Sequence, residues 1–159
     1  MNREIEELFQ QAKDGNLPED FDRWELSDKD NWSIAHTAAM HNNLPKGFTK
    51  WKIFNNMDWS VAHVAASCGN LPEGFDRWGI SNGKGQTIAH IAASCSNLPE
   101  DFDRWELSDN NGWSIAHVAA SRGNLPEGFD QWDLADNVGQ TVAHVASENN
   151  NLPKDKKSF

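Results

Sequence analysis

The chain has 159 residues, enough for one domain with a hydrophobic core, and 14 basic against 24 acidic residues give it a formal net charge of −10. Binding to a phosphate backbone requires clustered lysine and arginine, so this balance argues against direct nucleic-acid binding and is compatible with a basic protein partner. No apolar run approaches the length of a membrane span, and the charged first residues lack the organisation of a signal peptide. We therefore expect no membrane contact and a cytoplasmic location, in the protein's own cell or in a host cell.

The first segment, residues 1–15, is predicted to be an amphipathic helix. Ile5, Leu8, Phe9 and Ala12 fall on one helical face, and charged residues occupy the rest of the surface. A helix with one apolar and one polar face suits the end of a repeat array, so we interpret this segment as an N-terminal cap.

Residues 16–150 contain five units of 27 residues. The tripeptide Asn-Leu-Pro recurs with this spacing, and one histidine in each unit keeps the same step: His36, His63, His90, His117 and His144. Units this small bury their apolar faces only against neighbouring units, so the period predicts a solenoid. Residues 151–159 begin a further copy as a partial repeat and are expected to end in a solvated, lysine-rich tail.

One unit, 110–132, predicts the local structure of all five. Gly112 ends a turn, Ser114 is placed to cap a helix, and the helical stretch that follows ends near Gly123. Pro126 is placed to begin a second, short helix that directs Phe129 and a following tryptophan into the core. A 3₁₀ or extended second segment remains an alternative.

The stretch DNNGWSIAHVAASRGNL resembles an ankyrin repeat. The matching positions are Asp109, Gly112, Ser114, His117, Ala119, Ala120, Gly123 and Leu125. The unit is shorter than the usual ankyrin repeat of about 33 residues, and the Pro of the family motif is replaced by Ile or Val. The resemblance implies an all-α, ankyrin-like helix-turn-helix solenoid of five short repeats with an N-terminal helical cap. It also implies that each histidine hydrogen-bonds the Ser or Thr three residues before it.

Metal binding and catalysis find little support in the sequence. Equivalent atoms in stacked helical units lie about 10 Å apart, whereas zinc ligands must lie about 2 Å from one ion, so the five histidines are interpreted as structural. Cys68 and Cys95 occupy the same repeat position and are expected to be free thiols for the same reason. No nucleophile motif, phosphate-binding loop or dinucleotide fingerprint occurs. We expect no enzyme activity, no metal and no cofactor.

The positions that vary between repeats are the best candidates for function. They lie in the segment just before each helix, which the resemblance places at a finger tip beside the concave face. The candidate partner-binding residues are Trp32, Trp59, Gln86, Trp113, Gln140, Lys29, Met57 and Lys84. Tryptophan often anchors interfaces, but these residues are also suited to stacking on neighbouring fingers as structural aromatics. The favoured function is a non-enzymatic protein–protein interaction module, an inhibitor or adaptor.

Regularly spaced carboxylates suggest a second function. The alternative acidic face comprises Glu73, Asp76, Glu100, Asp103, Glu127 and Asp130. A row of carboxylates is able to act as a nucleic-acid mimic that blocks a basic nucleic-acid-binding protein, for example as a phage or bacterial anti-defence inhibitor. The helix dipole and solubility explain acidic residues equally well, and lysines in the second unit interrupt the row. Self-association by end-to-end stacking is a third possibility.

Overall fold

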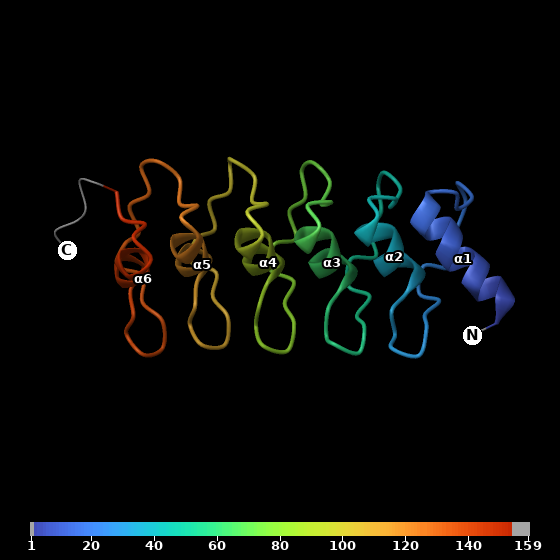
Figure 1. Cartoon of the computed structure of the whole chain (residues 1–159), viewed down its shortest axis with the longest axis horizontal. Coiled ribbons are helices and arrows are strands. Elements are labelled where there is room, and N and C mark those ends of the chain that lie inside the picture. Colours follow the sequence, from blue (N-terminus) through green and yellow to red (C-terminus); the bar gives the residue numbers. More distant parts are fainter. Residues whose placement is uncertain (1, 154–159) are drawn as a thin grey trace.

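The computed structural model describes residues 2–153, and in this range six helices form a single row (Figure 1). Their bounds are α1 Arg3–Asp14, α2 Ile34–Met40, α3 Val61–Ser67, α4 Ile88–Ser94, α5 Ile115–Arg122 and α6 Val142–Glu148. Each helix packs only on its neighbours in the chain. This is the nearest-neighbour arrangement of a solenoid.

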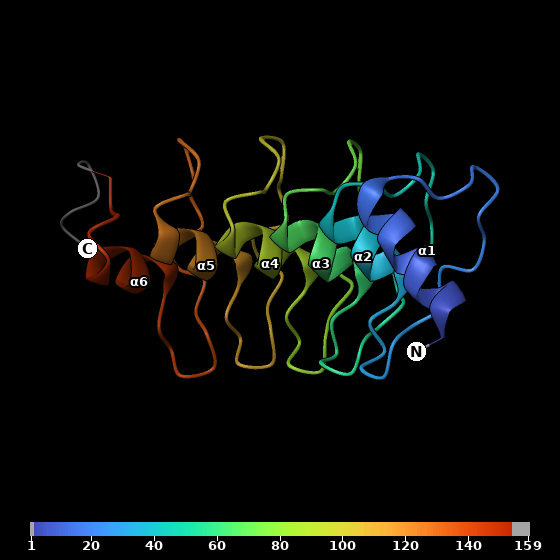
Figure 2. The ribbon, with the colours of Figure 1, turned by 45° about the vertical axis from the view of Figure 1, so that its right-hand side comes forward.

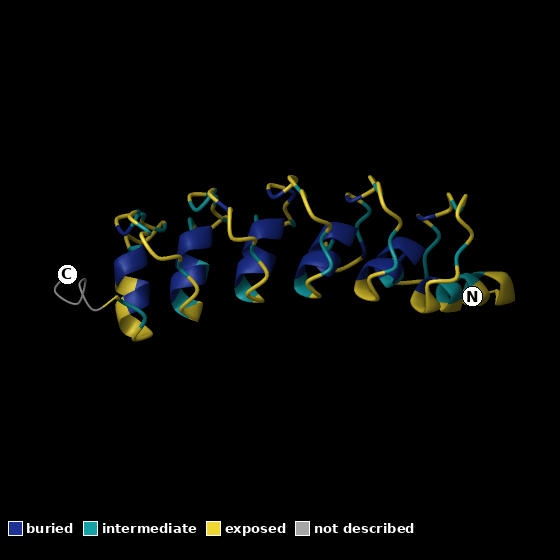
Figure 3. Ribbon diagram, turned by 90° about the horizontal axis from the view of Figure 1, so that it is seen from above, coloured by how far each residue is buried: buried dark blue, intermediate teal, exposed yellow. Residues whose placement is uncertain are grey.

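Two loops join each helix to the next, one on either side of the row of helices (Figures 1 and 2). On one side lies a turn loop that begins with Asn-Leu-Pro. On the other lies a short hairpin, called a finger here, that is closed by an isolated antiparallel bridge such as Phe54–Ser60. The five fingers are residues 27–33, 54–60, 81–87, 108–114 and 135–141. The inner parts of the helices are buried and the loops are mainly exposed (Figure 3).

Every short helix α2–α6 begins with its free amide groups satisfied, as α3 illustrates. The Val61 and Ala62 amides donate to the Ile53 and Trp51 carbonyls, at 3.0 and 3.3 Å. The His63 amide donates to Ser60 Oγ at 3.2 Å, which confirms the predicted serine cap. A seven-residue helix is marginal in isolation, so these partners and the tertiary packing are what sustain it.

The predicted second helix is wrong, and in residues 2–153 the segment after each Asn-Leu-Pro forms turns instead of the 3₁₀ helix named in the alternative. In the fifth unit the Phe129 amide donates to the Pro126 carbonyl at 3.2 Å, and Gly128 has a φ of 81°. This is a type II turn, whose positive φ at the third residue is incompatible with a helix. A second turn follows, in which the Leu134 amide donates to the Gln131 carbonyl at 3.3 Å. Two turns therefore return the chain to the finger.

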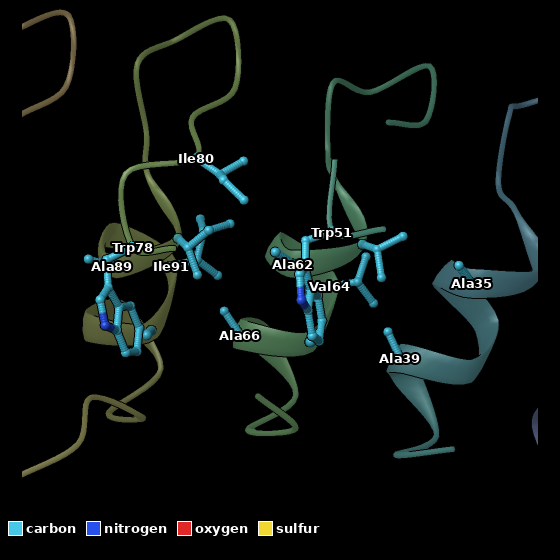
Figure 4. Close-up of a cluster of buried hydrophobic side chains, with 14 of the residues drawn as sticks. Ala35, Ala39, Trp51, Ala62, Val64, Ala66, Trp78, Ile80, Ala89 and Ile91 are labelled. Atoms are coloured by element: carbon cyan, nitrogen blue, oxygen red, sulfur yellow. The ribbon is translucent and has the colours of Figure 1, made fainter. Parts of the chain in front are cut away.

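The aromatic residues of the turn loops take over the packing that the missing helix would provide. Phenylalanine and tryptophan alternate along the row in edge-to-face contacts, for example Phe75–Trp78 at 5.3 Å and Trp78–Phe102 at 5.4 Å between ring centroids. The ladder runs through Phe21, Trp24, Phe48, Trp51, Phe75, Trp78, Phe102, Trp105, Phe129 and Trp132. Trp51 and Trp78 lie beside the alanines and branched residues of α3 and α4 (Figure 4). Such pairs stabilise beyond the area they bury, so the ladder links all five units.

The asparagine of Asn-Leu-Pro ties each helix end to the one before it. Asn70 Nδ2 donates to the Ala39 and Met40 carbonyls at the end of α2, at 3.0 and 3.2 Å. The Asn70 amide donates to the Ala65 carbonyl in α3 at 2.8 Å. The asparagines with the same double role are Asn43, Asn97 and Asn151. Asn124 Nδ2 donates instead to Ser96 Oγ, and within residues 2–153 Asn16 has no helix before α1 to bind.

The N-terminal cap forms as predicted. In α1, Ala12 is buried and Ile5, Leu8 and Phe9 are half-buried, whereas the remaining face is largely exposed. The expected solvated tail falls on residues 154–159, which lie outside the described residues, and the boundaries 1–15, 16–150 and 151–159 remain predictions. Within residues 2–153, no helix is both long and apolar enough to cross a membrane.

Candidate partner-binding surface

The five residues inside each bridge form the finger tip, and the first of them fixes the conformation. The tips are residues 28–32, 55–59, 82–86, 109–113 and 136–140. Asn55 Oδ1 accepts from the amides of Met57 and Trp59, at 2.9 and 3.1 Å. The equivalent acceptors are Asp28, Asn82, Asp109 and Asp136. The fourth tip residue has a positive φ in every finger, and it is glycine in three of them. The five tips therefore share one backbone shape.

Hydrogen bonds between neighbouring tips join the fingers into a row. The Asn56 amide donates to the Asp30 carbonyl at 2.9 Å, and the Asn110 amide donates to the Lys84 carbonyl at 3.1 Å. The second and third fingers are joined differently, since the Gly83 amide donates to the Asp58 carboxylate. The row is thus a continuous, hydrogen-bonded edge of the solenoid.

The third residue of each tip is exposed and differs in chemistry from finger to finger. These residues are Asp30, Met57, Lys84, Asn111 and Val138. The Met57 side chain is 74% exposed and that of Val138 is 88% exposed, although both are apolar. Sequence reasoning selected Met57 and Lys84 but missed Asp30, Asn111 and Val138. Their shared place in the repeat was the signal that could have identified them.

The three candidate tryptophans occupy the fifth tip position and are half-buried, so they are less solvent-facing than expected. Each folds back onto the histidine of its own unit, with ring centroids 5.1 Å apart for Trp32–His36 and 4.8 Å apart for Trp113–His117. Trp32 Nε1 also donates to Thr37 Oγ1 at 2.9 Å. These contacts give the tryptophans a structural role, and their role in binding stays a prediction.

The two glutamines at the fifth tip position are also half-buried and hydrogen-bonded. Gln86 Oε1 accepts from Asn82 Nδ2 at 3.1 Å, and Gln140 Nε2 donates to Glu148 at 3.1 Å. Lys29 lies at the second tip position and is exposed. In the second finger, Asn55 is only 7% exposed and its Nδ2 has no acceptor among the described residues, because Trp59 stands where Gln86 stands in the third finger. An unsatisfied buried donor is destabilising.

The repeated histidines hold the fingers to the helices, as the resemblance implied. His63 Nδ1 accepts from the Ser60 amide at 3.1 Å and from Ser60 Oγ at 2.7 Å. An amide only donates, so Nδ1 carries no proton and Nε2–H donates to the Gln86 carbonyl of the next finger, at 3.1 Å. His36, His90 and His117 make the same bridge to the next finger. His144 differs, since it is exposed and no finger follows it within residues 2–153.

Burial gives the histidine bridges a pH dependence. Desolvation lowers the pKa of His36, His63 and His90 below the ordinary value, although the hydrogen bond to the next finger's carbonyl opposes this shift. As the pH falls, these residues become protonated near pH 6.5 in the unfolded chain but only at a lower pH in the folded chain. We expect the free energy of unfolding to be constant above about pH 7 and to fall as the pH drops below about 6.5.

Urea denaturation at several pH values between 7.5 and 5.5 measures this effect above the range in which carboxylates titrate. Each histidine with a lowered pKa contributes at most about 1.4 kcal/mol per pH unit. A free energy of unfolding that stays flat over this interval would rule out neutral histidine bridges.

The acidic candidates lie on the opposite side of the row, in the turn loops. Glu73, Asp76, Glu100, Asp103, Glu127 and Asp130 are all exposed. Grooves lie between successive turn loops, and one of about 810 Å³ between loops 71–78 and 97–104 brings four of the six together. Those four are Glu73, Asp76, Glu100 and Asp103. The structure therefore separates the two candidate surfaces, which occupy opposite edges of the solenoid.

The remaining candidate chemistry is scattered. Cys68 and Cys95 are free and exposed at the ends of α3 and α4. Within residues 2–153, no cluster of three or more His, Cys, Asp or Glu side chains is arranged to hold a metal ion.

Comparisons with known proteins identify the fold. No family model and no curated protein matches the sequence. A chain in the solved complex of the predatory endopeptidase Bd0816 from Bdellovibrio bacteriovorus with the immunity protein Bd3460 is similar in structure, with a TM-score of 0.63, 20% identity, and coverage of 91% of this chain and 92% of that one. The ankyrin repeat domain of Bcl-3, a member of the IkappaB protein family, is also similar in structure, with a TM-score of 0.58 and 20% identity. The similarity covers 79% of this chain and 68% of that one. The chain is an all-α solenoid of ankyrin-like repeats.

Proposed function

We propose that this protein is a non-catalytic binding module, an inhibitor or adaptor, that recognises a protein partner through its row of finger tips. The observation that carries the proposal is the contrast within each tip. The first and fifth side chains and the positive φ of the fourth residue serve the common framework, whereas the side chain at the third position is exposed and differs in every finger. A rigid backbone that presents varied side chains is suited to recognition, because little conformational entropy is lost on binding.

The similar folds support a protein partner. One occurs in a complex of an endopeptidase with an immunity protein, and the other is an ankyrin repeat domain of an IkappaB family member. Fold alone does not determine function, so the tips themselves must be tested.

Affinity capture from the native cell lysate tests the proposal with matched variants. The tip variant carries Met57→Ser, Lys84→Ser and Val138→Ser, and the control carries Glu19→Ser, Asp20→Ser and Lys46→Ser in the turn loops. All six positions are exposed, so both variants are expected to fold. Since truncating central interface residues costs 1–2 kcal/mol or more, we expect the tip variant to bind the captured partner at least about tenfold more weakly and the control to bind it normally. Unchanged binding by the tip variant would contradict the proposal.

The tryptophans are tested separately by exchange to glutamine, which fills the same position in the third and fifth fingers. Trp32→Gln, Trp59→Gln and Trp113→Gln together preserve the framework better than alanine would. Loss of partner binding by this folded variant would support the tryptophans as anchors, and full retention would restrict them to a structural role.

A further inference from the structure

The groove between turn loops 71–78 and 97–104 combines an apolar floor with a strongly acidic rim. Pro72, Phe75, Pro99 and Phe102 line it together with Trp78. Its charged lining consists of Glu73, Asp76, Glu100, Asp101 and Asp103, against the single cation Arg104. Five carboxylates are thus gathered around aromatic and proline surface.

Internal ion pairs do not neutralise these carboxylates. The ion pairs found among residues 2–153 are Arg3–Glu7, Arg23–Glu4 and Lys50–Glu25, none of which involves the groove. All five carboxylates are exposed. The Arg104 side chain lies beside Gly79, and its Nη2 is 3.8 Å from the position that a Cβ would take on that glycine. The negative charge of the rim is therefore available to a partner.

The grooves along the row differ in charge, and the neighbouring one is balanced. Between loops 44–51 and 71–78 the lining includes Lys46 and Arg77 as well as Glu73 and Asp76, so opposite charges are balanced there. The apolar floor recurs in both grooves because the Leu-Pro and Phe-Trp framework recurs. Only the charge differs between them.

We propose that the groove between loops 71–78 and 97–104 binds a lysine- or arginine-containing segment of a protein partner. This inference rests on the proposed protein-binding function and adds a second contact on the opposite edge. Aliphatic stems of lysine or arginine pack on proline and phenylalanine while their charged ends reach carboxylates on the rim. A nucleic-acid mimic would instead present carboxylates on a protruding surface, whereas these line a hollow with an apolar floor. The shape therefore favours an inserted peptide segment.

A labelled short peptide of alternating lysine and leucine is the probe, and fluorescence anisotropy measures its binding to the full chain. The groove variant carries Glu73→Gln, Glu100→Gln and Asp103→Asn. The matched control carries Glu6→Gln, Glu106→Gln and Asp133→Asn, which remove the same charge at exposed positions outside the groove. Three exposed pairs of about 0.5 kcal/mol each predict about tenfold weaker binding for the groove variant and less than about twofold for the control. Equal losses in the two variants, or no binding by the natural chain, would overturn the inference.

A second peptide, with serine in place of leucine, tests the floor of the groove. We expect it to bind several-fold more weakly than the leucine peptide, because it leaves the proline and phenylalanine surface uncovered. Equal affinity for both peptides would indicate a generic acidic surface of the kind a nucleic-acid mimic uses, and would overturn the inference. The tip variant should bind the leucine peptide normally, so failure of the groove and failure of the tips are distinguishable.

Discussion

Trp78→Ala is expected to lower the free energy of unfolding by about 3–5 kcal/mol, the usual cost of truncating a large buried aromatic residue. Trp78 is buried and makes edge-to-face contacts with Phe75 of its own turn loop and Phe102 of the next. The substitution removes one step of the ladder that links the units. Urea denaturation followed by circular dichroism measures the change.

Trp59→Gln is the matched control for the loss of a tryptophan. Trp59 is half-buried at a position where Gln86 and Gln140 occur in other fingers. By analogy with the third finger, a glutamine there gives the buried Asn55 Nδ2 the acceptor it lacks. We therefore expect a loss of less than about 2 kcal/mol, typical of a substitution that leaves no large buried cavity. A loss equal to that of Trp78→Ala would contradict the distinction between ladder and finger tryptophans.

His63→Ala is expected to lower the free energy of unfolding by about 2–4 kcal/mol, because it combines a buried cavity with two lost partners. The Ser60 amide loses its acceptor and the Gln86 carbonyl loses its donor. Since His63 bridges one unit to the next, the two parts of the solenoid should also unfold less cooperatively. Denaturation curves recorded with different probes reveal this as transitions that no longer coincide.

His144→Ala provides the comparison within the same chain. His144 Nδ1 accepts from the Thr141 amide at 3.1 Å, as in the other units, but the residue is exposed. No finger follows to accept from its Nε2 within the described residues, so the expected cost is below about 1 kcal/mol. Similar losses for His63→Ala and His144→Ala would show that the bridge between units adds no stability.

The first half of each unit could be predicted from the sequence because its signals are local. The Ser or Thr cap and the helix act within a few residues, and Ser114, His117 and Gly123 take the predicted roles. The N-terminal cap followed from one amphipathic pattern. The ankyrin resemblance then supplied the order of these elements.

The second half could not be predicted in the same way, because Pro126 begins a helix and a turn equally well. The turn forms both with Gly128, which has a positive φ, and with Asp101, which does not, so no single residue type at this position signals it. The aromatic ladder and the Asn70 bridge depend on contacts between units, which a repeat pattern indicates without specifying. The third tip position could have been picked out from its place in the repeat, but which tip side chains are exposed depends on the contacts inside each folded finger.

The reactivity of Met57 toward oxidation tests the central claim, recognition through the finger tips, most directly. Met57 is 74% exposed on the second tip, and Met40, which is 44% exposed at the end of α2, is an internal reference. Limited peroxide oxidation followed by peptide mass spectrometry compares the two in the free protein and in its complex with the captured partner. We expect the partner to slow oxidation of Met57 much more than that of Met40. Unchanged oxidation of Met57 in a saturated complex would contradict this expectation and would move the interface away from the tips.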